Sequence, residues 1–338
     1  MKKSLGILLV LILAVSMFAG CQSTADVEAP AEEPAEKVEE VAEPAEEESE
    51  MIEIALLVKG TDSGFWQKVI SGGEAFGADN DNVNVTIYGP ASEADIDESI
   101  TILENVITSG PDAIVIASNA GEGAVPAIED AKSKGIPVIT VDTKIPTDAV
   151  TSHLATDNVL GGALAAEAMV KELDAAGIAK EGKIAIVAAV AGVDTIIDRD
   201  GGFADKMAEL APDIEILTPV YVDNEIEKAL AETEQIITRD SDTLIGIYAD
   251  NNHTGDGVGR AIKQAGLQDS VIVVAYDDDQ EQIDFLEEGV IKTLIIQNNY
   301  NMGYSGCEYA VKAINGEEIP SFVDTGVKVT TAADLPLE

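Results

Sequence analysis

Polar and charged residues stand directly after several strand-length apolar runs of this sequence. Asp142 and Thr143 follow one run, Asp277 follows another, and Lys59, Asn251 and Gln297 stand at the ends of three more. Ser63 lies in the loop after Lys59, and Arg199 comes after a Gly-containing loop that follows Val190. Carboxylates, amides and an arginine hydrogen-bond well to vicinal hydroxyls, and flat rings such as Phe65 and Trp66 pack on the apolar face of a sugar. The pattern predicts a site for a sugar or polyol. Adjacent helical residues point about 100° apart, and of the two rings we favour Trp66 for stacking.

Other chemistries are conceivable for the same residues. Asp142 and Asp277 resemble the carboxylate pair of a glycosidase. The run 277–279 consists of three aspartates, but the glycine and glutamate of a calcium-binding loop are missing, so we expect no metal. The glycines at 121–123 and 255–259 lack the G-x-G-x-x-G spacing of a dinucleotide site. We therefore expect no cofactor. We also expect no enzyme, because the family resemblance described below implies that the two aspartates only accept hydrogen bonds from hydroxyl groups.

The elements that must position these residues alternate between strands and helices. Apolar runs of strand length occur at 52–58, 83–88, 113–117, 136–141, 184–190, 214–222, 244–249, 271–276 and 291–296. Between them, one helical face is formed by Ile96, Ile100, Leu103 and Ile107, and another by Ile226, Leu230, Thr233 and Ile237. Near-continuous Val/Ile runs separated by helices are typical of buried parallel strands. The sequence predicts an α/β protein with two doubly wound, Rossmann-like parallel-sheet lobes. Their ligands would bind at the carboxyl ends of the strands.

The N-terminal segments predict export rather than a core. Residues 1–21 combine a basic start, an apolar run and Ala-Gly before Cys21, which is the pattern of a lipoprotein signal peptide. A plain signal peptide with an incidental cysteine is the alternative. Residues 22–50 repeat Ala, Glu, Pro and Val without an aromatic residue, which predicts an acidic disordered tether. We expect a protein held by lipid at Cys21 to the outer face of the cell membrane.

The charge restricts the partners. The 63 acidic residues against 20 Lys and Arg give a formal net charge of −43. Phosphate contacts require clustered basic residues, so we expect no nucleic acid and no membrane contact other than the lipid anchor. Such a charge fits either a saline habitat or an ordinary acidic extracellular protein.

An ordered set of segments resembles the ribose-type periplasmic sugar-binding proteins of ABC transporters. The segments are IALLVKGTDSGFWQKVISGGE, PDAIVIAS, KGIPVITVDT, ATDNVLGG, DRDGGF, IYADNN, VVAYDDD and IIQNN, in this order. The resemblance implies a periplasmic binding protein of type I, with an N-terminal lobe of 51–156 plus 298–326. It implies a C-terminal lobe of 157–297 plus 327–338, with three segments crossing between the lobes. It also implies an interlobe site that closes on one sugar, and an ABC permease as partner of a monomeric protein.

The resemblance also implies site residues. Phe65 and Trp66 match the stacking rings of the family, and the polar set is matched by Asp142, Arg199, Asn251, Asp277 and Gln297. Four positions depart from the family: Thr143 replaces an arginine, Asn224 replaces a third ring that Tyr221 could supply, Lys59 replaces a small polar residue, and Ser63 replaces an asparagine. We expect Arg199 and Asp277 to be exposed in the open state and Asp278 to face solvent. A receptor for a sugar-like signal would use the same fold and remains an alternative to import.

Overall fold

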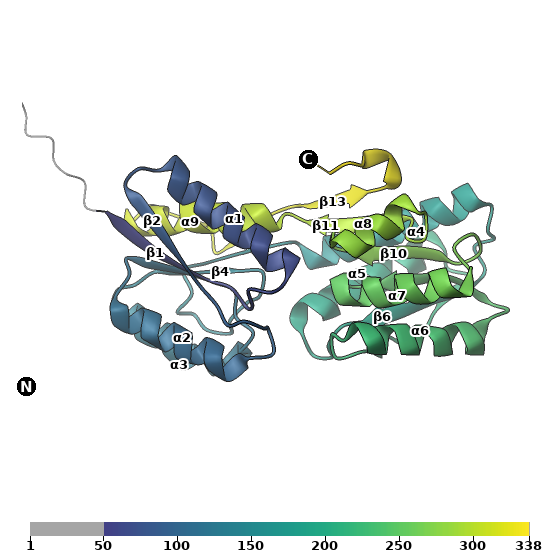
Figure 1. The fold of residues 1–338 in the computed structure, drawn as a ribbon, viewed down its shortest axis with the longest axis horizontal. Helices are drawn as coiled ribbons and strands as arrows, with labels where there is room; N and C mark the ends of the chain where they lie inside the picture. The colour runs from purple at the N-terminus through teal and green to yellow at the C-terminus, as the bar shows by residue number, and fades with distance from the viewer. Residues whose placement is uncertain (1–50, 338) are drawn as a thin grey trace, which may run out of the picture. The chain divides into compact units, whose positions relative to one another are not determined.

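Two α/β lobes, each built on its own sheet, make up the described part of the chain (Figure 1). The structure is a computed structural model that describes residues 51–337, and the predicted signal peptide, tether and Cys21 lie outside the described residues. None of the described helices combines the length and apolarity needed to cross a bilayer. The two sheets confirm the fold class predicted from the alternation of apolar runs.

The first sheet has the strand order β12-β5-β4-β3-β1-β2, and all its neighbouring strands are parallel. Helices α1 and α9 supply the core on one face, and α2 and α3 supply the core on the other. The elements are β1 (Ile52–Leu57), α1 (Gly64–Asp79), β2 (Val83–Tyr88), α2 (Ile96–Ser109), β3 (Ala113–Ile116), the 3₁₀ turn η1 (Gly121–Ala124), α3 (Val125–Ser133), β4 (Val138–Val141), β5 (Ser152–Ala155), α9 (Asn299–Ile314) and β12 (Phe322–Asp324).

The second sheet has the order β13-β11-β10-β9-β6-β7, with β8 paired to β6 and β13 antiparallel to β11. Helices α4 and α5 pack on one face, and α6, α7 and α8 pack on the other. The elements are α4 (Asn158–Ala176), β6 (Gly182–Ala188), α5 (Asp194–Leu210), β7 (Ile214–Ile216), β8 (Val220–Tyr221), α6 (Ile226–Asp240), β9 (Leu244–Ala249), α7 (Asn252–Ala265), β10 (Ile272–Tyr276), α8 (Gln280–Glu287), β11 (Thr293–Gln297), β13 (Val327–Thr330) and the 3₁₀ turn η2 (Ala332–Asp334).

The chain passes between the two sheets three times, after β5, after β11 and after β12. Two of these connections are hydrogen-bonded to each other. The Thr325 N–H donates to the Ala155 carbonyl at 3.0 Å, and the Asp157 N–H donates to Asp324 Oδ1 at 3.1 Å. Short connections held side by side are suited to act as a hinge between two rigid lobes.

The apolar stripe of α6 differs by one position from the predicted stripe. The buried residues are Ala229, Thr233 and Ile236, whereas Leu230 and Ile237 are half-buried at its edge. The reason is the close approach of α6 to α7, where a side chain at Gly257 would overlap the Ala229 methyl group. Small residues therefore form the centre of this contact.

The apolar run 214–222, predicted as one strand, forms the two short strands β7 and β8. Pro219 lies between them, and proline has no N–H to donate to a sheet. The short strands β12 and β13 were not predicted, because three or four partly exposed residues carry no apolar pattern.

Candidate functional site

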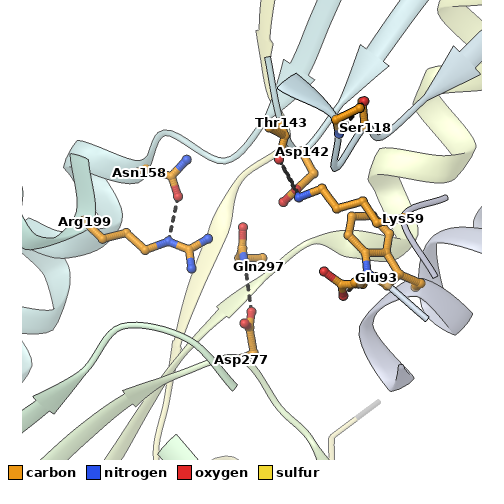
Figure 2. Close-up of polar contacts among 11 residues, drawn as sticks. Lys59, Glu93, Ser118, Asp142, Thr143, Asn158, Arg199, Asp277 and Gln297 are labelled. Carbon is orange, nitrogen blue, oxygen red and sulfur yellow. Dashed lines mark hydrogen bonds and ion pairs between the residues drawn. The ribbon is translucent and has the colours of Figure 1, made fainter. Parts of the chain in front are cut away.

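A cleft of 2470 Å³ is lined by the carboxyl ends of strands from both sheets. All the residues predicted to bind ligand line this one cleft, although they come from distant parts of the chain. They are Lys59, Ser63, Phe65, Trp66, Asp142, Thr143, Arg199, Asn224, Asn251, Asp277 and Gln297. Figure 2 shows several of them pointing toward the same space from opposite sides.

On the wall formed by the first sheet, Lys59, Asp142 and Thr143 form one hydrogen-bonded group. Lys59 Nζ lies 2.9 Å from Asp142 Oδ2 and 2.6 Å from Thr143 Oγ1, and the threonine hydroxyl donates to the same Asp142 oxygen at 2.7 Å. Burial alone would raise the pKa of Asp142, but Lys59, Thr143 and the more distant Arg199 together hold it below its usual range. Asp142 is therefore an ionised acceptor with its second oxygen, Oδ1, left for a ligand.

Asp277 occupies the equivalent position on the wall formed by the second sheet. Both aspartates follow a strand in the left-handed region, with φ of 60° for Asp142 and 73° for Asp277. The Asp142 N–H donates to the Leu154 carbonyl of the neighbouring strand, and the Asp277 N–H donates to the Ile295 carbonyl, both at 2.9 Å. Aspartate is among the few residues other than glycine that adopt this conformation readily, so the turn and the carboxylate are specified together.

The electrostatics of Asp277 differ from those of Asp142. Gln297 Nε2 donates to Asp277 Oδ1 at 2.9 Å (Figure 2). Burial raises the pKa of Asp277 to about 7, against the opposing effects of Arg199 and Gln297. Asp277 therefore exchanges a proton near neutral pH, and can either accept a hydrogen bond from a hydroxyl group or donate one to it.

Arg199 is oriented by three partners. Its Nε donates to Asn158 Oδ1 at 2.8 Å and Nη1 donates to the Asp250 carbonyl at 2.9 Å. The guanidinium carbon lies 4.0 Å from the centre of the Tyr276 ring. Arg199 and Asp277 are only 4% and 5% exposed, so the expectation that both are exposed was wrong. Both groups nevertheless line the cleft.

The two aromatic residues differ in burial. Trp66 is 3% exposed, belongs to the core, and donates its indole N–H to Glu93 Oε1 at 2.5 Å. Phe65 is half-buried and packs edge-to-face on it, with the ring centres 4.8 Å apart. Phe65 therefore offers more ring surface to the cleft than Trp66, contrary to the preference for Trp66. Tyr221 is not among the residues that line the cleft.

The side chains of Asn251 and Asn224 form a hydrogen bond with each other. Asn251 caps α7 by accepting from the Thr254 N–H at 3.0 Å, and its Nδ2 donates to Asn224 Oδ1 at 2.6 Å. The side-chain oxygen of Asn251 is thus engaged in capping α7. One N–H of the Asn251 Nδ2 group and both N–H groups of Asn224 Nδ2 remain available to a ligand in the cleft.

Comparison with known proteins identifies the family. The model of the periplasmic binding protein domain matches residues 54–318. The chain belongs to the periplasmic binding protein family. The resemblance to the ribose-type sugar-binding members is confirmed, and a family of binding proteins agrees with the expectation that the chain is not an enzyme.

Known relatives match this chain over most of its length. The ribose import binding protein of Haemophilus influenzae is 26% identical, over 82% of this chain and 90% of its own. A solute-binding protein of Agrobacterium radiobacter, solved with D-arabinose, is 31% identical with a TM-score of 0.78, over 85% of this chain and 96% of its own. One of Agrobacterium vitis, solved with D-fucose, is 34% identical with a TM-score of 0.75, over 84% and 97%.

Residues that position the predicted groups were missed by sequence reasoning. Asn158 lies within the segment ATDNVLGG, but only its contact with Arg199 reveals its role. Tyr276 was treated as a strand residue, and its ring lies against the Arg199 guanidinium. Glu93 follows no apolar run and has no signal in the sequence. Among residues 51–337, no group of three or more metal-ligating side chains is found.

Proposed function

We propose that this periplasmic binding protein captures a neutral sugar or polyol in its cleft and delivers it to an ABC permease. The observation that carries the proposal is the pair of equivalent carboxylates, Asp142 and Asp277, on opposite walls of the cleft, each with one oxygen uncommitted. Together with Arg199 they present acceptors and donors to vicinal hydroxyl groups from both sides.

The relatives support this ligand class. The names of these relatives refer to ribose, allose, D-arabinose and D-fucose, and one is a xylitol-binding protein, a polyol binder. Several are described as import binding proteins, which favours import over sensing. The departures at Lys59, Thr143 and Asn224 lie at the cleft wall, and we propose that they select the particular sugar.

The charge of the cleft favours an uncharged ligand. Twelve acidic residues line it against four basic ones. Of the basic residues, Lys59 is neutralised by Asp142. The field of the cleft therefore repels a sugar acid, and Lys59 is not free to hold a carboxylate.

The size of the cleft requires a movement. At 2470 Å³ it exceeds the several hundred cubic ångström that ordinarily enclose a small ligand. We propose lobes of 51–156 plus 298–326 and 157–297 plus 327–338 that close by rotation at the three connections. The closed state is selected because ligand contacts both walls only there. The monomer suffices for this mechanism.

A thermal-shift panel of pentoses, hexoses, polyols and uronic acids tests the function. A ligand at 100 times its dissociation constant adds about 2.7 kcal/mol to the free energy of unfolding, which such an assay resolves. Stabilisation by a neutral sugar or polyol is expected. Stabilisation by uronic acids alone would overturn the neutral ligand class, and stabilisation by nothing in the panel would overturn sugar binding.

We also propose that Cys21 carries a lipid that holds the protein at the outer face of the membrane. The support is the Ala-Gly-Cys junction after an apolar run, followed by the acidic segment 22–50. Cys21→Ser should move the protein from the membrane to the soluble fraction of fractionated cells. Retention of the variant in the membrane fraction would contradict the anchor.

A further inference from the structure

One ion pair joins the two lobes beside the cleft. Lys68 Nζ on α1 lies 2.5 Å from Asp278 Oδ2 in the loop between β10 and α8. Among residues 51–337, it is the only salt bridge that joins the helices and loops of the first sheet to those of the second. The side chain of Asp278 is only 13% exposed, so the expectation that it faces solvent was wrong.

The two partners stand next to the residues of the candidate site. Asp278 directly follows the cleft carboxylate Asp277, and Lys68 lies on the helix that begins with Phe65 and Trp66. A contact between Lys68 and Asp278 therefore restrains the distance between the start of α1, which carries Phe65 and Trp66, and the Asp277 carboxylate.

The charges around the pair explain why a lysine is needed there. Residues 277–279 are three consecutive aspartates, and each is largely buried. Burial raises the pKa of Asp279, an effect that the Lys68 charge opposes. Lys68 thus offsets the repulsion within a loop whose three carboxylates would otherwise push one another apart.

We propose that Lys68 and Asp278 are positioning residues that form a brace between the two lobes, and that closure by rotation at the three connections proceeds with this contact in place. The expected effect of the brace on affinity rests on the proposed sugar binding. Its expected effect on the distance between the lobes does not depend on that function. Preorganisation of this kind raises affinity because less freedom is lost on binding.

Charge reversal and charge exchange test the brace. Lys68→Glu and Asp278→Lys should each weaken affinity for the sugar found by thermal shift by about two- to tenfold, because each places like charges together. The double variant with both changes restores opposite charges and should recover most of the loss. Lys134→Glu is the matched control, since Lys134 is equally exposed at 43% and pairs only within α3 and its end.

A second measurement needs no ligand. Spin labels at exposed positions 104 on α2 and 234 on α6 report the distance between the lobes, and the buried Cys307 is shielded from labelling. We expect a longer and broader distance distribution in each single variant and the original one in the double variant. An unchanged distribution in the single variants, or no recovery on exchange, overturns the brace. If the distribution responds while no sugar binds, the brace stands and the proposed function fails.

Discussion

Removal of the Arg199 side chain should separate the binding role of this residue from its structural role. Arg199→Ala deletes a buried cation that lines the cleft and donates to Asn158 and to the Asp250 carbonyl rather than to a carboxylate. Hydrogen bonds from a charged group are worth about 1.5–3 kcal/mol, so the dissociation constant of the sugar should rise about 10- to 150-fold. Titration calorimetry measures this change directly.

The same substitution also affects the free protein. It leaves the Asn158 side-chain oxygen and the Asp250 carbonyl without their donor, so the melting temperature without ligand should fall. It also removes the charge that opposes the effect of burial on Asp277, so the pKa of Asp277 should rise above its value of about 7. Arg199→Lys keeps the positive charge but lacks the planar guanidinium group with its several donors. This variant should lose affinity, but it should shift the pKa of Asp277 less than Arg199→Ala does.

The control for Arg199 is Arg239→Ala. Arg239 is 60% exposed on α6, away from the cleft, and its loss changes the net charge equally. Its affinity should match that of the wild type. An Arg199→Ala variant that binds within twofold of the wild type would remove Arg199 from the site. Equal losses in both variants would show that only the overall field matters.

Three further outcomes follow from buried groups and close contacts. Burial raises the pKa of Asp256 to about 8, so the folded state holds a proton that the unfolded state releases near pH 4, and stability falls as the pH rises between these values. Asp256→Asn should therefore raise the melting temperature at pH 8 but not at pH 4, and an equal gain at both would contradict the assignment. Gly72→Ala should cost about 3 kcal/mol or more in urea unfolding because its Cβ would overlap the backbone of α9, whereas Gly64→Ala on the same helix meets nothing and serves as control. Asn158→Asp keeps the acceptor for Arg199 and should bind ligand better than Asn158→Ala in calorimetry; the reverse order would refute the positioning of Arg199 by this side chain.

The alternation of strands and helices and the positions of the candidate site residues can be predicted from the sequence alone. Buried parallel strands require continuous apolar runs, and their carboxyl ends meet at one edge, so residues such as Asp142 and Asp277 were placed correctly at the cleft without any knowledge of contacts. Both aspartates adopt the left-handed backbone conformation, and each lies one residue after the end of its apolar run.

Which of these groups remain available to a ligand depends on the packing of the whole fold. The pairing of Lys59 with Asp142 joins residues that are far apart in the chain, and the burial of Trp66 depends on the rotation of α1 about its axis. The same holds for the α6 stripe and for the contact of Lys68 with Asp278 across the two walls. Local patterns encode which face of an element is apolar, but the partners of a polar side chain depend on how whole elements pack, and no local pattern records that.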